Sequence, residues 1–283
     1  MPPVGSGQLL VHGGLRRKPV LPRHLDHAVK PVVTLADVLP ADPGPRTGPR
    51  LAVVVSLNFP DMTEVTAELV RRFTRTALTE AADLGFDWTL TDTSVDLPAP
   101  AAVLDTDAVL VLGGGDVDSE LYGVAGPARH EYGVDPQADM FTMDVIRGAV
   151  DRGVPLLSIC RGSQLLNLAY GGTLIPDLES WELHRGDYVT GPLFIDEHIN
   201  VMPGTRLREI LGCNDLVVRS GHHQAVAQVA DELRTAALAD DGLVEGVEHP
   251  SAWAIGVQWH PEDDDGHGKD RQALFRALLE AAG

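Results

Sequence analysis

A single cysteine lies where an apolar segment changes abruptly into a helical pattern. Val154–Leu157 has the character of a buried strand, and Ser158–Gly162 (SICRG) leads from it into a helical pattern that begins near Gln164. A strand that turns directly into a helix over small-X-Cys-X-Gly presents its thiol at the tip of a tight turn, as Gly-X-Ser-X-Gly turns do for serine. The N-terminus of the following helix stabilises negative charge on that sulfur. The pattern therefore predicts Cys160 as a nucleophile.

Short apolar runs alternate with amphipathic helical patterns from residue 50 onward. Strands are predicted at 51–56, 88–90, 108–112, 154–159, 243–248 and 254–258, and helices at 64–84, 138–152, 163–170 and 272–282. Apolar strands of this kind, separated by helices, are typical of a parallel sheet that is covered on both faces. We therefore predict an α/β fold with a mostly parallel central sheet, helices on both faces and a small antiparallel addition.

The first 49 residues differ in composition from the rest of the chain. They are rich in proline and glycine and show no sustained hydrophobic period. Prolines at this density exclude a long helix. We predict an N-terminal extension over residues 1–49 and one catalytic domain over residues 50–283.

The net charge of −19 limits the classes of partner that this chain can have. A strongly negative field repels phosphate backbones and argues against nucleic acid. No apolar run approaches the ~18 residues of a membrane span, and the N-terminus lacks the hydrophobic region of a signal peptide. Two cysteines, Cys160 and Cys213, do not make a disulfide framework. We expect a cytoplasmic protein without a nucleic-acid or membrane partner.

A second motif supplies the groups that a cysteine nucleophile needs. The apolar run that ends at Val257 is followed by Gln258–Glu262 (QWHPE), which contains a His-X-acid arrangement. His260 is the candidate base that takes the thiol proton and returns it to a leaving amine. Glu262 is the candidate group that fixes the imidazole tautomer and stabilises the imidazolium. Cys160, His260 and Glu262 together have the outline of a Cys-His-Glu triad.

Donors for a developing oxyanion have a natural source in two places. The backbone N–H of Arg161 lies just after the nucleophile, at the start of a helix. Gly114 and Gly115 follow the strand at 108–112, and in a parallel sheet the carboxyl end of that strand can lie beside the cysteine turn. Glycines let the backbone approach a substrate oxygen closely.

The pair His222-His223 invites comparison with a metal site. Adjacent histidines on a strand point to opposite faces, so they rarely share a metal. A role beside the substrate, or in the structure, is the better interpretation. The run Asp263–Asp265 is most simply a solvated acidic turn. These two motifs therefore do not predict a metal site.

Five blocks of sequence, taken in order, resemble the class I glutamine amidotransferase superfamily and, within it, the γ-glutamyl-γ-aminobutyrate hydrolase family. The blocks are Gly113–Gly123, Pro155–Leu178, Ser220–Ala225, Asp241–Gly246 and Gly256–Glu262. The resemblance covers about residues 50–282. It implies the superfamily's flavodoxin-like fold and the triad of Cys160, His260 and Glu262, with no cofactor.

The resemblance also implies a substrate and a pocket. Members of this family cleave γ-glutamyl amide bonds and release glutamate. Gln164 resembles a residue that contacts the γ-glutamyl group, and Ser220, His222 and His223 resemble pocket residues. The resemblance further suggests a homodimer.

Three functions stay open at this point. The first is a free-standing γ-glutamyl amide hydrolase whose amine product is a small amino acid or a polyamine derivative. The second is a glutaminase subunit that supplies ammonia to a separate synthase, because the sequence ends soon after Glu262 and we expect no fused synthase domain. The third is a repurposed biosynthetic or binding member of the fold. A hydrolase works alone, whereas a glutaminase subunit is nearly silent without its partner.

Overall fold

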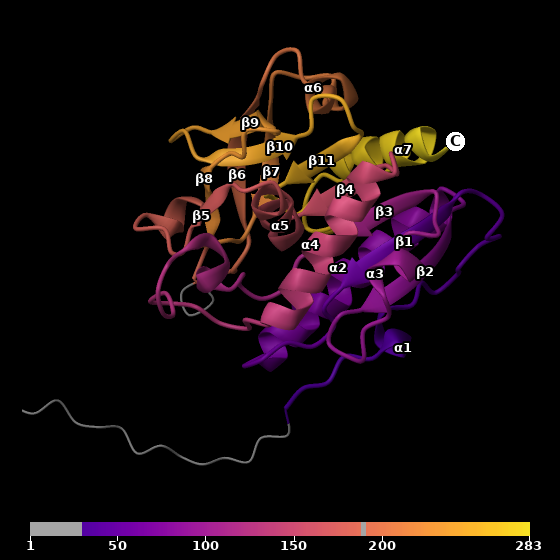
Figure 1. The fold of residues 1–283 in the computed structure, drawn as a ribbon, viewed down its shortest axis with the longest axis horizontal. Helices are drawn as coiled ribbons and strands as arrows, with labels where there is room; N and C mark the ends of the chain where they lie inside the picture. Colours follow the sequence, from indigo (N-terminus) through magenta and orange to yellow (C-terminus); the bar gives the residue numbers. More distant parts are fainter. Residues whose placement is uncertain (1–29, 188–190) are drawn as a thin grey trace, which may run out of the picture.

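The computed structural model describes residues 30–187 and 191–283, whose strands form one eleven-stranded sheet (Figure 1). The strand order is β2-β1-β3-β4-β11-β10-β9-β6-β7, with β5 and β8 attached through β10. The elements in chain order are α1 (Leu35–Val38), β1 (Arg50–Val55), α2 (Glu64–Asp83), β2 (Asp87–Asp92), α3 (Pro100–Val103), β3 (Ala108–Val111), the 3-10 helix η1 (Ser119–Tyr122), α4 (Pro136–Asp151), β4 (Leu156–Ile159), α5 (Arg161–Ala169), β5 (Thr173–Ile175), the 3-10 helix η2 (Trp181–Leu183), β6 (Ile195–Val201), α6 (Arg206–Leu211), β7 (Asp215–Ser220), β8 (Ala225–Gln228), β9 (Arg234–Ala239), β10 (Val244–Glu248), β11 (Ala254–Val257) and α7 (Lys269–Ala282).

The sheet has a parallel and an antiparallel half. Strands β2, β1, β3, β4 and β11 pair in parallel. Strand β10 runs antiparallel to β11 and begins the second half, which β5 to β10 form with antiparallel pairing. The predicted α/β fold with a mostly parallel central sheet is confirmed, and the antiparallel part is larger than the small addition that the sequence predicts. Of the antiparallel strands, the sequence predicts only β10 individually.

Side chains of the parallel strands alternate between two apolar cores, one on each face of the sheet. Leu51 and Val53 of β1 pack with α2 and α7, whereas Ala52 and Val54 pack with α4 and α5. Burial on both faces explains why these strands read as continuous apolar runs. The result is three layers, with the helix pairs on opposite sides of the sheet (Figure 1). Among the described helices, none combines the length and the apolar composition needed to cross a membrane.

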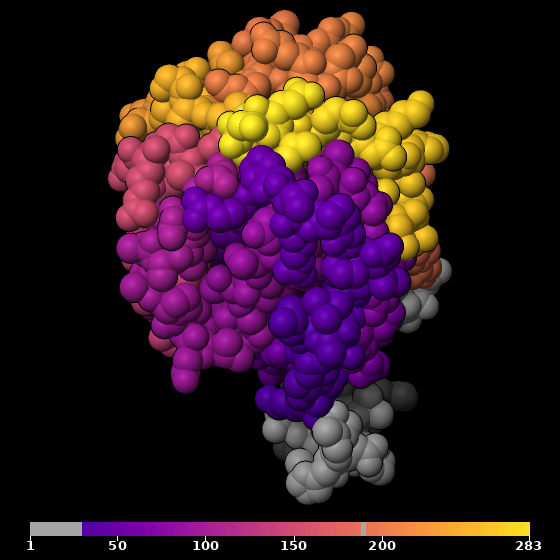
Figure 2. Space-filling model, turned by 90° about the vertical axis from the view of Figure 1, so that its right-hand side faces the viewer, coloured from indigo at the N-terminus to yellow at the C-terminus, as the bar shows by residue number. Residues whose placement is uncertain are grey.

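Part of the predicted N-terminal extension lies against the body of the protein. Val33 and Val38 are buried and belong to the same core as β1 and α2. The backbone N–H of Val33 donates to Oδ1 of Asn58, and Nδ2 of Asn58 donates to the carbonyl of Val33, both at 2.9 Å. Figure 2 shows the first described residues (indigo) as part of a continuous surface with the body. Residues 1–29 of the predicted extension lie outside the described residues.

Two glycine contacts seat α5 closely between β3 and β11. A Cβ added at Gly162 of α5 would lie 2.9 Å from the carbonyl oxygen of Val111 in β3. A Cβ added at Gly256 of β11 would lie 2.6 Å from Oγ of Ser163 in α5. Because both distances are shorter than real Cβ contacts, any larger residue would move the helix away from the sheet.

We predict that Gly162→Ala destabilises the protein by about 1–3 kcal/mol, because the added methyl meets backbone that cannot move aside. Gly148→Ala in α4 is the matched control. Its methyl meets only the end of the Leu104 side chain, and alanine favours a helix by about 1 kcal/mol over glycine. Thermal unfolding of both variants tests this. Equal midpoints for the Gly162 variant and the wild type would contradict the close seating of α5.

Candidate active site

The turn from β4 into α5 places Cys160 in a backbone conformation that side chains rarely adopt. Its φ is 51° and its ψ is −107°, a combination that costs about 1–3 kcal/mol for a residue other than glycine. Hydrogen bonds hold the residue on both sides. The N–H of Cys160 donates to the carbonyl of Val257 at 2.8 Å, and the N–H of Gln164 donates to the carbonyl of Cys160 at 3.2 Å. The turn therefore has the form that the sequence predicts.

The two strands beside β4 bring distant segments to the turn. β3 pairs with β4 on one side and β11 pairs with it on the other. The glycines that follow β3 thus lie beside the cysteine turn, as the parallel pairing predicts, and His260 follows β11. A Cβ added at Gly113 would lie 3.1 Å from Cε1 of His260 and 3.7 Å from Cβ of Cys160. A side chain at position 113 would therefore press on the imidazole of His260.

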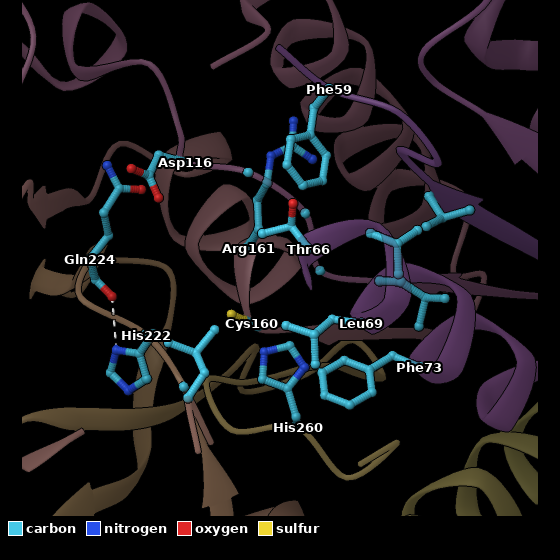
Figure 3. A pocket seen from close by; sticks show the side chains of 18 of the residues that line it. Phe59, Thr66, Leu69, Phe73, Asp116, Cys160, Arg161, His222, Gln224 and His260 are labelled. Carbon is cyan, nitrogen blue, oxygen red and sulfur yellow. Dashed lines mark hydrogen bonds between the residues drawn. The ribbon is translucent and has the colours of Figure 1, made fainter. Parts of the chain in front are cut away.

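His260 is fixed by a carboxylate and by two aromatic rings, one of which, Phe73, lies beside it in Figure 3. Its Nδ1 lies 2.7 Å from Oε1 of the buried Glu262. The ring of Phe73 lies 5.0 Å from the imidazole and that of Phe194 lies 4.9 Å from it. Because Glu262 takes up Nδ1, the ring can present Nε2 to the cavity.

The electrostatics of this group favour a charged imidazole. Burial lowers the pKa of His260, but the negative charges of Glu262 and of the Cys160 sulfur, with their hydrogen bonds, outweigh it and raise the pKa well above its ordinary value. A protonated imidazole beside a cysteine sulfur can donate a proton to a leaving group.

Arg161 organises the predicted oxyanion region. Its amide is among the first of α5, which have no acceptor within the helix. Its buried guanidinium pairs through Nη2 with Oδ1 of the buried Asp139. A Cβ added at Gly114 would lie 3.3 Å from Cδ of Arg161, whereas one at Gly115 would meet the carbonyl of Gly133. All three predicted donors, Arg161, Gly114 and Gly115, line the cavity around Cys160.

Two glutamine side chains connect the cavity floor to the sulfur. Nε2 of Gln164 donates to the carbonyl of Gln224 at 2.9 Å and to Oε1 of Gln258 at 3.1 Å. Nε2 of Gln258 in turn lies 3.4 Å from Sγ of Cys160. Sequence reasoning missed Gln258, as it missed Asp139 and the two phenylalanines, because no spacing marks them. The only sequence feature that could have indicated a role for Gln258 is its position two residues before His260.

The predicted pocket residues divide into two groups. The side chain of Ser220 is buried, donates to the carbonyl of His184 at 2.7 Å and lies outside the cavity lining. His222 and His223 both line the cavity. Burial lowers the pKa of His222 to about 3, so that this ring is neutral.

His223 is held by two carboxylates on the opposite side. Its Nε2 lies 3.0 Å from Asp116 and its Nδ1 lies 3.0 Å from Asp177. Burial opposes a charge on His223, but the hydrogen bond and the charge of Asp116 raise the pKa above its ordinary value. The two adjacent histidines therefore face different partners, and their pKa values are shifted in opposite directions.

Two adjoining cavities surround these residues. The inner cavity, of about 90 Å³, contains Cys160 and His260 (Figure 3). The outer cavity, of about 490 Å³, carries Arg185 and the carboxylates of Asp61 and Asp177. The residues that line both are Thr66, Tyr132, Leu193, Gly221 and His223. A substrate can thus place its reacting end inside and a second group in the outer cavity.

Comparison with a solved structure defines the class of fold. The crystal structure of a Thermoplasma acidophilum protein, provisionally identified as a GMP synthase subunit, matches with a TM-score of 0.57 over 82% of this chain and 94% of that chain. The sequences are 18% identical, so the likeness is one of fold. This chain thus shares its mixed α/β fold, a central sheet flanked by helices, with that protein.

The sequence comparisons define the family. The chain belongs to the peptidase C26 family, whose model matches residues 68–262. It is 37% identical over 190 residues to a Mycobacterium tuberculosis protein provisionally named a glutamine amidotransferase, and the match covers 66% of this chain and 60% of that one. It is 36% identical over 176 residues to the γ-glutamyl-γ-aminobutyrate hydrolase of Escherichia coli O157:H7, with 59% of this chain and 67% of that one covered. The chain therefore spans less than two thirds of the Mycobacterium relative. The family match and these relatives confirm the predicted resemblance.

We predict that Gln258→Leu slows alkylation of Cys160 by iodoacetamide about 10- to 100-fold. A hydrogen bond to a charged atom contributes about 1.5–3 kcal/mol, and the variant removes the one that Gln258 donates to the sulfur. The measurement uses a Cys213→Ser background, and Gln272→Leu on the exposed face of α7 is the control. An unchanged rate in the Gln258 variant would show that this amide does not stabilise the thiolate.

Proposed function

We propose that this chain is a cysteine-dependent hydrolase that cleaves γ-glutamyl amides through a thioester on Cys160 and releases glutamate. The observation that carries the proposal is the position of Cys160 on a strained turn beside the buried His260–Glu262 pair. The name of the Escherichia coli relative, a γ-glutamyl-γ-aminobutyrate hydrolase, suggests the substrate class. Residues 50–283 are the proposed catalytic domain.

Acylation uses the three side chains in turn. Sγ of Cys160 attacks the γ-carbonyl carbon, and the carbonyl oxygen becomes an oxyanion near the amides of Arg161 and of the Gly113–Gly115 turn. His260 then gives its proton to the amine nitrogen, the C–N bond breaks, and the amine leaves. Glu262 holds the imidazole in the tautomer that this step needs.

Deacylation repeats the sequence with water as the nucleophile. The now neutral His260 takes a proton from water, and the resulting hydroxide attacks the thioester carbonyl. The C–S bond breaks, glutamate leaves, and the proton on His260 again faces the sulfur of Cys160. No step requires a group beyond water and these residues.

The two cavities suggest how the substrate divides. The inner cavity takes the γ-glutamyl chain against Gln164, and the outer cavity takes the amine. Arg185 in the outer cavity suits an amine that carries a carboxylate, such as an amino acid. Asp61 and Asp177 suit a cationic amine, such as a polyamine. A panel of γ-glutamyl substrates with both kinds of amine, together with glutamine, therefore measures directly which amine the outer cavity accepts.

We predict that the purified chain alone releases glutamate from at least one γ-glutamyl amine, and that Cys160→Ala abolishes this release without unfolding the protein. The loss follows because the nucleophile is gone. Cys213→Ser is the matched control and should keep full activity, since Cys213 lies outside both cavities. Glutamate release and thermal unfolding are measured for all three proteins. Turnover in the alanine variant would rule out the covalent mechanism.

The same panel tests the alternative of a glutaminase subunit. The name of the Mycobacterium relative favours this alternative. In that case the folded chain would be silent on every amine, and hydrolysis of glutamine would begin only when a synthase is added. Silence that no synthase relieves would instead indicate a repurposed member of the fold.

We predict that Glu262→Gln moves the alkaline limb of the kcat/KM profile to lower pH and reduces kcat. The charge of Glu262 helps to raise the pKa of His260, so its removal lets the imidazolium lose its proton at lower pH. The thermal midpoint should change less than kcat, because the glutamine amide keeps the shape of the side chain. Initial rates across the pH range test this. An unshifted alkaline limb would mean that another group sets the protonation of His260.

A further inference from the structure

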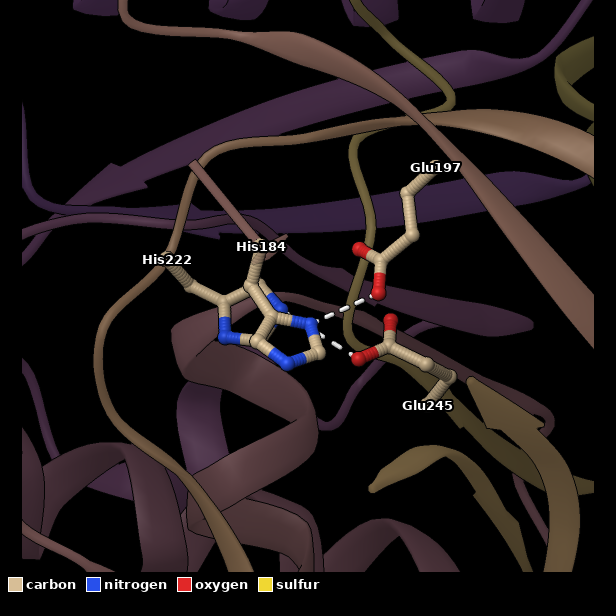
Figure 4. Close-up of side chains that lie close together, drawn as sticks. All are labelled: His184, Glu197, His222 and Glu245. Atoms are coloured by element: carbon tan, nitrogen blue, oxygen red, sulfur yellow. Dashed lines mark hydrogen bonds and ion pairs between the residues drawn. The ribbon is translucent and has the colours of Figure 1, made fainter. Parts of the chain in front are cut away.

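Four buried side chains converge behind the catalytic cavity. They are His184, which follows η2, Glu197 of β6, His222 between β7 and β8, and Glu245 of β10 (Figure 4). One nitrogen or oxygen atom from each lies within 4.8 Å of those of the others. All four residues are at least nine-tenths buried. His222 also lines the catalytic cavity, but the proposed mechanism gives the cluster as a whole no role.

Hydrogen bonding leaves several of these atoms unpaired. Both carboxylate oxygens of Glu245, Oε2 of Glu197 and Nε2 of His222 are buried without a hydrogen-bond partner among the described residues. A buried carboxylate without a partner is costly. Glu245 is fully buried, so solvent does not relieve this cost. The cluster therefore needs a positive charge or a proton at its centre.

The tautomer of His222 points to a cation. Its Nδ1 lies 2.9 Å from the carbonyl oxygen of Gln224, and a carbonyl only accepts, so Nδ1 carries the hydrogen. A neutral ring then has a bare lone pair on Nε2. That atom lies 3.3 Å from Oε1 of Glu245, which is also an acceptor. Two acceptors aimed at each other are the arrangement that a metal ion resolves.

His184, like His222, has one ring nitrogen within hydrogen-bond distance of an acceptor outside the cluster. Its Nε2 lies 3.1 Å from Oδ2 of Asp241 and its Nδ1 lies 2.6 Å from Oε1 of Glu197. A histidine that ligates a metal usually donates its other ring N–H to a carboxylate or a carbonyl, which fixes its orientation. His184 has the carboxylate of Asp241 in that position, and His222 has the carbonyl of Gln224.

We propose that this cluster binds one Zn²⁺ through Nδ1 of His184, Nε2 of His222 and the carboxylates of Glu197 and Glu245. Two imidazoles and two carboxylates are ligands that zinc accepts in a four-coordinate site. Two carboxylate charges balance the ion, so the buried site becomes neutral. Four protein ligands leave no open position, which makes the site structural rather than catalytic.

The sequence predicts no metal here, and the proposal departs from that prediction. The adjacent histidines do point apart, since His223 faces Asp116 and Asp177, and only His222 joins the cluster. Its partners come from segments far away in the chain. The other acidic group, Asp263–Asp265, already has arginine partners, since Arg72 pairs with all three carboxylates and Arg219 with Asp263, and it carries no such inference.

The test measures zinc directly and does not depend on activity. Protein in a Cys160→Ala background is stripped with a chelator, because Cys160 and His260 could themselves hold zinc. It is then titrated with Zn²⁺ in competition with a chromophoric chelator, and its thermal midpoint is recorded. We expect one Zn²⁺ per chain and a higher midpoint with zinc than without it.

Glu245→Gln removes one ligand while its amide can donate to Nε2 of His222, so the variant should fold. We expect its zinc affinity to fall by more than about 100-fold, beyond the 10- to 100-fold typical of changes in groups behind the ligands. Glu197→Gln should lose zinc affinity to a similar extent. It keeps the test valid if the Glu245 variant fails to fold. His198→Gln is the matched control, because His198 is an exposed histidine beside Asp215 and Asp240. It should bind zinc like the wild type.

Co²⁺ in place of Zn²⁺ provides a spectroscopic check. The ion should show the visible absorption of tetrahedral cobalt without a thiolate charge-transfer band, since no cysteine is a ligand. Much less than one zinc per chain would overturn the proposal and would mean that a shared proton neutralises the cluster. Unchanged zinc binding in both glutamate variants would overturn it too, because the metal would then lie elsewhere.

Discussion

The strained backbone of Cys160 is the constraint on which the rest of the site depends. A residue with a Cβ holds this conformation only when its surroundings supply more than the ~1–3 kcal/mol that the strain costs. Here the stabilising contacts come from α5. Its first turn packs between β3 and β11, in contact with them at Gly162 and Gly256. If the helix moved outward, the turn could relax and the sulfur would leave the space beside His260. Gly162 and Gly256 take no part in the reaction, but their small size thus decides whether the sulfur of Cys160 lies beside His260.

The electrostatics of the inner cavity are set by local ion pairs and not by the net charge of the chain. The chain carries a net charge of −19, yet the charged groups that line the inner cavity are paired. Glu262 lies against His260, Asp139 against Arg161, and Asp116 against His223. Each pair is buried, so each group is expensive without its partner. The polarity of the cavity therefore depends on the ion-pair partner of each charged side chain.

Features carried by adjacent residues could be predicted from the sequence. The apolar runs locate the parallel strands because both faces are buried, and the cysteine turn and the His-X-acid motif are short enough to recognise. Their proximity follows from the pairing of β3, β4 and β11. The triad, the oxyanion donors and the pocket residues are brought to one region, apart from Ser220, whose side chain faces the carbonyl of His184. Which of them act in catalysis remains a prediction.

Other features depend on tertiary pairing and leave no local pattern. The antiparallel strands β5 to β9 lack the continuous apolar run of the parallel strands, as β6 (IDEHINV) illustrates, and only pairing with β7 places Glu197 opposite Val218. Asp139 is one carboxylate among many on a helix, and only the fold brings it to Arg161. Val33 and Val38 lie in a proline-rich segment without a hydrophobic period, yet both are buried. Such contacts require the fold before they can be found.

The zinc cluster and the nucleophile share one network of hydrogen bonds. The carbonyl of Gln224 accepts from Nδ1 of His222 and from Nε2 of Gln164, both at 2.9 Å. Gln164 continues to Gln258, which donates to the sulfur of Cys160. A metal that fixes the ring of His222 would therefore fix the carbonyl that orients Gln164, and through it the donor to the sulfur. A closed structural site would then serve the chemistry without touching the substrate, because it holds the floor of the cavity in place.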